Sequence, residues 1–145
     1  MDQRITNKNN NLTPTRENYL RALYQLSRSG GGVRLTDLAR MQSVRLPTAR
    51  HAVDCLKDAG LVAQESYGLI TLTEDGRVTG RAICDRFDLT RHFLMDVLGV
   101  PEGAADREAC IMEHHLDEDT LNRLAAFVKN VTDGQVQEAV RLVTA

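Results

Sequence analysis

The chain contains no tryptophan and only three cysteines among its 145 residues. Three scattered cysteines are too few for a disulfide framework and fit a reducing compartment, where a cysteine is a small core residue or a ligand. No apolar run approaches the roughly 18–20 residues that a membrane-spanning helix needs. The polar, Asn-rich segment 1–12 lacks the apolar centre of a signal peptide, so we expect a flexible tail on a cytoplasmic protein without a membrane partner.

Charge is distributed unevenly along the chain, although the formal net value is only −2. Residues 13–80 carry nine Lys or Arg and seven Asp or Glu, whereas residues 81–145 carry seven and twelve. This asymmetry permits a contact between nucleic acid and the first half, and it argues against one in the acidic second half.

The first half contains signals for three helices. Thr13 and Pro14 are typical of a helix start, because the hydroxyl caps the first turn and proline has no N–H to lose there. Two shorter helical segments then flank a break at residues 42–46, and the second of them opens at Pro47. Two helices separated by a tight turn, with basic side chains on the second, are typical of a helix-turn-helix.

A hairpin and further helices are expected after this segment. Two β-prone runs, 61–65 and 69–73, surround a Gly-containing turn and predict a β wing, after which Thr73 can cap a long helix reaching about Leu98. Additional helices are expected at residues 104–116, 118–131 and 135–143. The predicted fold is therefore mainly α with a small β wing: a flexible tail (1–12), a winged helix-turn-helix (13–73) and an α-helical dimerisation and metal-sensing domain (74–145).

The helix from Pro47 to Ala59 is the expected DNA-reading element. Arginine suits this role because its planar fork pairs with guanine in the major groove or binds phosphate. A threonine at a helix N-terminus suits phosphate oxygens. The basic residues alone also fit a solvated surface, and the order of the elements favours DNA. The candidate DNA-binding residues are Arg45, Pro47, Thr48, Arg50, His51, Lys57 and, in the wing, Tyr67.

Four stretches resemble the diphtheria toxin repressor family, in particular its short manganese transport repressor branch, which lacks a C-terminal SH3-like domain. They are residues 13–20, 35–62, 72–76 and 113–116, the last reading Glu-His-His-Leu. The resemblance covers about residues 12–131 and implies a homodimeric repressor whose affinity for double-stranded operator DNA rises when Mn²⁺ or Fe²⁺ binds. The sequence gives no sign of a small organic ligand.

A candidate metal site lies in the predicted helix 104–116. Cys110, Glu113 and His114 occupy one stripe of this helix at offsets of three and four, so their side chains can converge on one ion. A thiolate with a carboxylate and an imidazole suits Fe²⁺, Co²⁺, Ni²⁺ or Zn²⁺ better than Mn²⁺. The alternative is a half-buried polar helix face with a core cysteine. Asn18 and Asp106 are candidate additional ligands.

The family usually completes its metal site from other helices, and this sequence differs there. Asn18 stands where the resemblance implies an acidic or methionine ligand, Arg21 where it implies a glutamate, Phe87 where it implies a histidine, and Arg91 where iron-type members carry an acid. Phe87 cannot ligate a metal, and the arginines oppose a cation. Two mechanisms stay open. In the first, the three residues of the stripe hold an ion with help from Asp106, Asp88, His92 or water. In the second, arginine–carboxylate pairs lock the DNA-competent shape without any metal, or another signal has replaced it.

Two other classes of function also stay open. Cys110 and His114 could imitate a nucleophile–base pair, but the sequence has no Gly-rich phosphate loop or second acid–base cluster, so we do not expect an enzyme. A winged-helix module that docks a protein partner in place of DNA is the other alternative. Dimerisation is expected from the helical half, through helix 104–116 and an apolar face formed by Leu121, Leu124, Phe127 and Val128.

Overall fold

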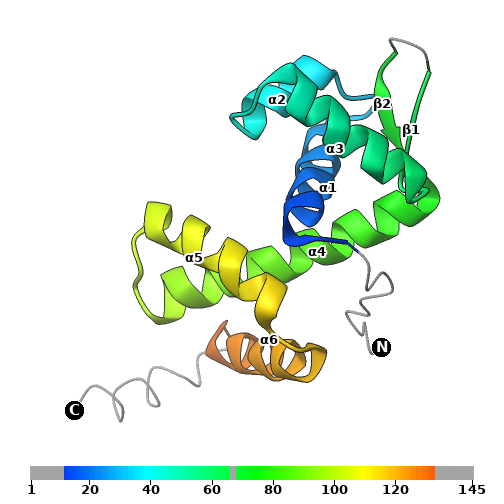
Figure 1. The fold of residues 1–145 in the computed structure, drawn as a ribbon. Helices are drawn as coiled ribbons and strands as arrows, with labels where there is room; N and C mark the ends of the chain where they lie inside the picture. The colour runs from blue at the N-terminus through cyan, green and yellow to red at the C-terminus, as the bar shows by residue number, and fades with distance from the viewer. Residues whose placement is uncertain (1–11, 66–67, 133–145) are drawn as a thin grey trace. The chain divides into compact units, whose positions relative to one another are not determined.

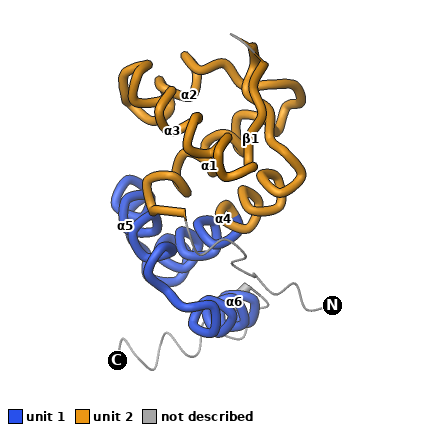
Figure 2. Tube along the Cα trace, turned by 45° about the vertical axis from the view of Figure 1, so that its right-hand side comes forward, with its two compact units in different colours: residues 1–6, 85–145 blue, residues 7–84 orange. Residues whose placement is uncertain are grey.

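The computed structural model describes the chain from Leu12 to Thr132 except residues 66 and 67. These residues form two compact units that divide after Cys84, so that one long helix contributes to both. The first unit along the chain is drawn orange in Figure 2, where the key calls it unit 2, and the second is drawn blue and called unit 1. The predicted tail 1–11, Tyr67 and the predicted helix 135–143 lie outside the described residues. No helix in the described part of the chain is both long enough and apolar enough to cross a membrane.

The first unit has the predicted order of a winged helix-turn-helix, which confirms that fold (Figure 1). Its elements are α1 (Pro14–Leu26), a 3-10 turn η1 (Ser27–Ser29), α2 (Leu35–Met41), α3 (Leu46–Asp58), β1 (Val62–Gln64), β2 (Ile70–Leu72) and the first turns of α4 (Glu74–His92). The core is built from leucines that are fully buried, including Leu20, Leu38 and Leu56, one from each of the first three helices.

Local chemistry explains the helix ends of this unit. The Thr13 hydroxyl accepts a hydrogen bond of 3.3 Å from the backbone N–H of Arg16, which caps α1. Between α2 and α3, Ser43 adopts a left-handed φ of 54°, and the chain turns there tightly enough for Val44 N–H to bond Ala39 C=O at 3.0 Å. This turn sets the direction in which α3 leaves α2.

The wing is a two-stranded antiparallel sheet in which Val62 pairs with Leu72. Val33, just before α2, exchanges both backbone hydrogen bonds with Ile70 and so ties the wing to the helices. The Thr73 hydroxyl then accepts from Gly76 N–H at 3.1 Å and caps α4, as predicted. Gly76 has no room for a side chain, because a Cβ there would lie 1.8 Å from the Leu61 carbonyl oxygen. The first turns of α4 therefore pack in the winged unit.

The second unit is helical. It contains the rest of α4, a π-helical turn η2 (Phe93–Val97), α5 (Glu102–His115) and α6 (Glu118–Thr132). The predicted long helix thus keeps α geometry only to His92, and the chain turns at Gly99, whose φ is 72°. Leu94 of η2 and Ala105 and Ala109 of α5 form the buried centre of this unit.

The packing of α6 corrects the predicted dimerisation face. Leu121 and Val128 are 3% and 7% exposed, so they are buried within the chain and cannot form an interface between chains. The reason is that α6 turns this apolar stripe toward its own unit, where Phe127 contacts the Phe93 ring edge-on at 6.3 Å between centroids. Phe127 is itself 39% exposed and Leu124 is half-buried, so these two residues of the predicted face remain partly accessible.

Candidate DNA-reading helix and metal-ligand helix

The sequence-predicted DNA-binding residues that the structure describes are exposed and lie in α3 or at its start. Arg45 is the N-cap of α3 with extended backbone, and Pro47 follows in the first turn, so the chain enters the helix as the sequence predicts. The described candidates are all exposed, namely Arg45, Pro47, Thr48, Arg50, His51 and Lys57. Within the part of the chain that the structure describes, no carboxylate pairs with Arg45, Arg50 or Lys57. Their charges are therefore available to an anionic partner.

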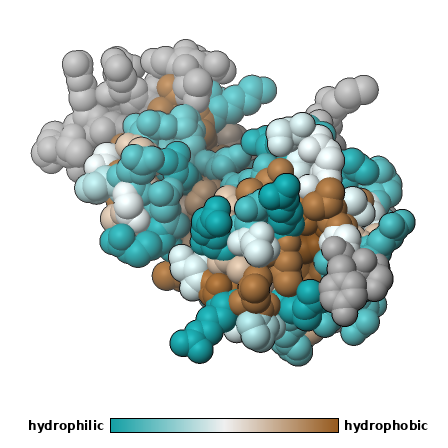
Figure 3. Space-filling model, turned by 90° about the horizontal axis from the view of Figure 1, so that it is seen from above, coloured by the Kyte–Doolittle hydropathy of each residue, from teal (hydrophilic) through white to brown (hydrophobic). Residues whose placement is uncertain are grey.

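Apolar side chains are also exposed on the first unit. Met41 at the end of α2, Leu46 at the start of α3 and Leu69 beside the wing are each about half exposed, at 46%, 47% and 51%. Figure 3 shows hydrophobic surface among polar side chains on the face of the molecule that it draws. Exposed apolar groups can contact thymine methyl groups or the surface of a protein, so they do not by themselves choose between these partners.

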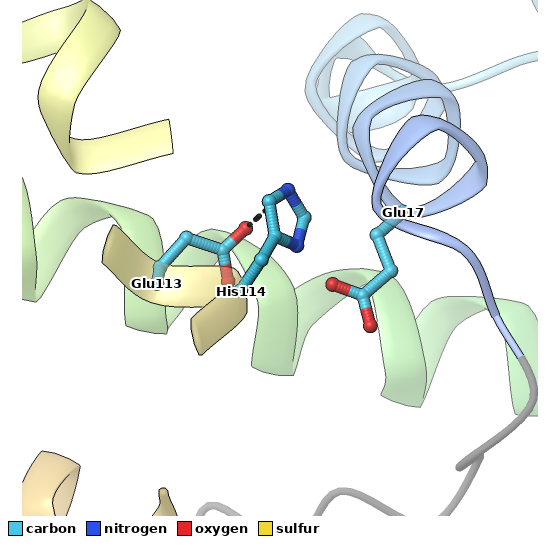
Figure 4. A group of neighbouring side chains, drawn as sticks. All are labelled: Glu17, Glu113 and His114. Atoms are coloured by element: carbon cyan, nitrogen blue, oxygen red, sulfur yellow. Dashed lines mark ion pairs between the residues drawn. The ribbon is translucent and has the colours of Figure 1, made fainter. Parts of the chain in front are cut away.

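The candidate metal ligands lie on α5 in the second unit. Glu113 is 2% exposed and the His114 side chain 4%, while Cys110 is half-buried. His114 Nε2 lies 3.3 Å from Glu113 Oε1, and Figure 4 shows the two side chains side by side on α5. Figure 4 also labels Glu17, a buried carboxylate on α1 of the other unit. Glu17 was not predicted from the sequence.

A buried arginine holds the other oxygen of Glu113. Arg86 Nε on α4 donates to Glu113 Oε2 at 3.2 Å, and the side chains are 5% and 0% exposed. Sequence reasoning missed Arg86, although a signal was present: Arg86 is spaced three residues from Ile83 and four from Thr90, both buried. A charge on the buried stripe of a helix requires a buried partner of opposite charge.

Arg91 binds the carboxylates at the start of α5. Its guanidinium donates to Asp106 at 2.5 Å and to Glu102 at 3.1 Å. The hydrogen bond to Asp106 raises the pKa of Arg91 above its ordinary value, and the charges of Glu102 and Asp88 add to this effect. Arg91 therefore stays charged at physiological pH. Phe87, one turn earlier, packs against the apolar centre of the unit.

Two donor atoms of α5, on Glu113 and His114, lie at a distance that fits one metal ion. Two ligand atoms at about 2.1 Å from an ion in tetrahedral geometry are about 3.4 Å apart, close to the 3.3 Å between Glu113 Oε1 and His114 Nε2. Asp106 differs from them, because Arg91 already binds it. Asn18 is half-buried on α1, in the other unit. The roles of Asn18, Asp106 and Cys110 as ligands stay predictions.

Comparison with known proteins adds two family matches. The family described as "Iron dependent repressor, N-terminal DNA binding domain" matches residues 11–69. The family described as "Iron dependent repressor, metal binding and dimerisation domain" matches residues 73–135. Together the two matches span most of the described chain, and they meet close to Thr73, where the wing ends and α4 begins.

Individual relatives agree with these matches. An uncharacterised HTH-type transcriptional regulator of Methanocaldococcus jannaschii is 31% identical over 81% of this chain and 94% of its own length. The iron-dependent repressor IdeR of Mycobacterium tuberculosis is 32% identical over 85% of this chain. The structure of the manganese regulator SloR superposes with a TM-score of 0.72 at 26% identity over 81% of this chain. The chain spans about half the length of these last two proteins, 54% and 55%.

Proposed function

This chain belongs to the family of iron-dependent repressors, and from this premise we propose that it is a homodimeric, sequence-specific transcriptional repressor with an altered metal site. The observation that carries the proposal is the exposed basic surface of α3, which follows a helix-turn-helix turn and precedes a wing. As a DNA-binding regulator it would act in the cytoplasm, and we assign no catalytic role to Cys110 or His114.

Operator recognition is assigned to the N-terminal half of α3. Arg50 is the residue most suited to read a base, because it is exposed in the second turn and has no carboxylate partner among the described residues. Arg45 and Thr48 suit phosphate contacts beside the helix N-terminus. If Arg50 pairs with guanine, Arg50→Ala should weaken operator binding by about 1–3 kcal/mol and relax specificity at one position. Fluorescence anisotropy with a labelled operator at fixed salt measures both effects, and unchanged affinity would remove this assignment.

Metal sensing is assigned to Cys110, Glu113 and His114. A bound divalent ion would be coordinated by these three side chains, and its positive charge would neutralise the buried Glu113 carboxylate. Arg86 acts as a positioning residue, since it holds Glu113 Oε2 and leaves Oε1 facing His114. A thiol among the donors favours Fe²⁺ over Mn²⁺, because the softer ligand prefers the softer metal.

Arg91 stands where the resemblance implies an acidic metal ligand, and its guanidinium takes the place of a second metal ion's charge. Its side chain joins α4 to α5 through Asp106 and Glu102, so a guanidinium neutralises carboxylates that could otherwise attract a cation. This part of the helical unit is held by an ion pair that needs no metal. The reduced site therefore rests on one stripe of α5, and the proposed activation by metal depends on the donors of that stripe.

The proposed homodimer is supported by the dimerisation domain that the family match describes. In the helical unit, Ile111 on α5 and Leu98 are 63% and 58% exposed, and Phe127 on α6 is 39% exposed. Exposed large apolar side chains of this kind are candidates for burial between two chains. A two-fold dimer would present two copies of α3 to a pseudo-palindromic site. Sedimentation equilibrium at micromolar protein should give twice the chain mass.

Metal dependence is tested by operator binding in chelator and in added Fe²⁺ or Mn²⁺. Cys110→Ala and His114→Ala should each abolish any increase in affinity on adding metal, because each removes one of three donors. Glu108→Gln is the matched control, since Glu108 is exposed on the same helix and off the ligand stripe. Full operator affinity in chelator, unchanged by either metal, would favour the metal-independent version of this regulator.

A protein-docking module is the second candidate, favoured by the exposed Met41, Leu46 and Leu69. Salt distinguishes the two functions. Operator binding through phosphate contacts weakens steeply with salt, by a slope of roughly −0.9 per phosphate in a log–log plot. Absence of duplex binding, or binding indifferent to salt, would favour protein docking through these apolar side chains.

A further inference from the structure

The C-terminal half of α3 carries a second group of side chains suited to binding a transition metal. His51, Asp54, Cys55 and Asp58 follow one another at offsets of three and four, so they lie on one stripe of the helix, about 100° wide. His51, Asp54 and Asp58 are exposed, and Cys55 is half-buried. Imidazole, thiolate and carboxylate are the donors that zinc-class ions prefer in proteins.

Two of these donors already face each other. Cys55 Sγ and His51 Nε2 are 3.8 Å apart, with one helical turn between them. An ion bound tetrahedrally through a metal–sulfur distance of about 2.3 Å and a metal–nitrogen distance of about 2.05 Å would hold these atoms about 3.6 Å apart. The ion would therefore need only a small adjustment of two side chains. Paired donors at i and i+4 on a helix are a known way of holding zinc.

The remaining donors of the stripe are carboxylates. Asp54 and Asp58 lie three residues beyond His51 and Cys55 respectively, and they are exposed, so their side chains are free to turn toward an ion held by that pair. These two carboxylates outnumber Lys57 in the C-terminal half of α3, whereas Arg45 and Arg50 stand at its start. The balance of charge in this half of the helix therefore allows a cation to bind there.

We propose that His51 and Cys55, assisted by Asp54 or Asp58, form a binding site for a zinc-class divalent ion, and that an ion there opposes operator binding. The site is separate from the donors on α5. Binding of the ion rests only on the geometry of α3, whereas its effect on DNA rests on the proposed function. An ion with its remaining water ligands would occupy space beside Arg50 on the surface assigned to the operator, and it would hold His51 away from DNA.

Cobalt(II) reports binding directly, because a thiolate bound to Co²⁺ gives an intense near-ultraviolet charge-transfer band. Cys110→Ala protein serves as the starting chain, so that the thiol on α5 cannot produce the band. We expect this protein to show the band with one Co²⁺ per chain, and the added change Cys55→Ala to remove it. His51→Ala should weaken Co²⁺ binding by about tenfold or more. A band that survives Cys55→Ala, or its absence from the starting chain, would overturn the site.

Operator binding tests the consequence. In anisotropy titrations, Zn²⁺ should weaken operator binding by the Cys110→Ala protein and not by the Cys110→Ala, Cys55→Ala protein. Lys57→Ala is a control for the cobalt measurement alone: it should keep the Co²⁺ band, although Lys57 is itself a candidate DNA contact. Zn²⁺ that binds without changing operator affinity would overturn the regulatory part. A protein that shows the Co²⁺ band but never binds DNA would instead refute the proposed function and leave the metal site standing.

Discussion

Replacing Arg86 by methionine should be the most destabilising single charge removal in the helical unit. The Arg86 and Glu113 side chains are 5% and 0% exposed, and Nε lies 3.2 Å from Oε2. Methionine keeps much of the length and apolar volume of arginine but leaves the Glu113 carboxylate charged and buried. Removing one partner of a buried pair typically costs about 3–5 kcal/mol, because the remaining charge has lost its compensation.

Thermal unfolding followed by circular dichroism, in chelator and at fixed pH, measures this cost. At about 2–4 °C per kcal/mol for a chain of this size, the melting temperature should fall by roughly 6–20 °C. The double variant Arg86→Met, Glu113→Gln removes the buried charge as well and should recover most of the loss. This recovery separates the charge effect from lost packing.

The exposed pair Arg123–Asp119 provides the control. Its atoms are 2.9 Å apart, closer than those of the buried pair, but both side chains are 79% exposed. Arg123→Met should cost less than about 1 kcal/mol, since water replaces the lost partner. An equal effect of Arg86→Met and Arg123→Met, or no recovery in the double variant, would refute the view that Glu113 is a buried charge held by Arg86.

Two further predictions concern packing and charge. Gly76→Ala should destabilise the winged unit by more than about 2 kcal/mol in denaturant unfolding, because its Cβ would overlap the Leu61 carbonyl. The control Gly103→Ala, whose Cβ would make only an ordinary contact, should be neutral or stabilise by up to about 1 kcal/mol. Equal losses of stability in the two variants would contradict this reasoning. Arg91→Ala leaves Asp106 and its acidic neighbours without their cation, so Mn²⁺ binding in calorimetry should strengthen, and unchanged binding would contradict the substitution of metal by guanidinium. Because the pKa of Arg91 is raised, the stability that its charge provides is complete below the ordinary arginine pKa and is lost only as the pH rises through the raised value. The stability that Arg91 provides should therefore be constant across physiological pH.

Local signals predicted the winged unit well. Thr13 and Thr73 cap the helices that follow them, and the two β-prone runs pair as a wing. Each of these features depends on residues within a few positions of one another, where hydroxyl caps, proline and turn glycines act through short-range backbone geometry. The family resemblance extended the prediction to the helical half, and the family matches confirm it.

Contacts between distant residues were decided by tertiary structure. Helical phase shows that Arg86 and Glu113 lie on buried stripes, but only the packing of α4 against α5 makes them partners across 27 positions. The same packing lets Arg91 bind Asp106, and the packing of α6 within its own unit buries Leu121 and Val128, which the sequence alone offered as an interface. Periodicity fixes the face on which a side chain lies, whereas its partner depends on which helix covers that face. The sequence therefore determined the elements, their caps and the donor types on α5, and the tertiary structure decided which charges those donors meet.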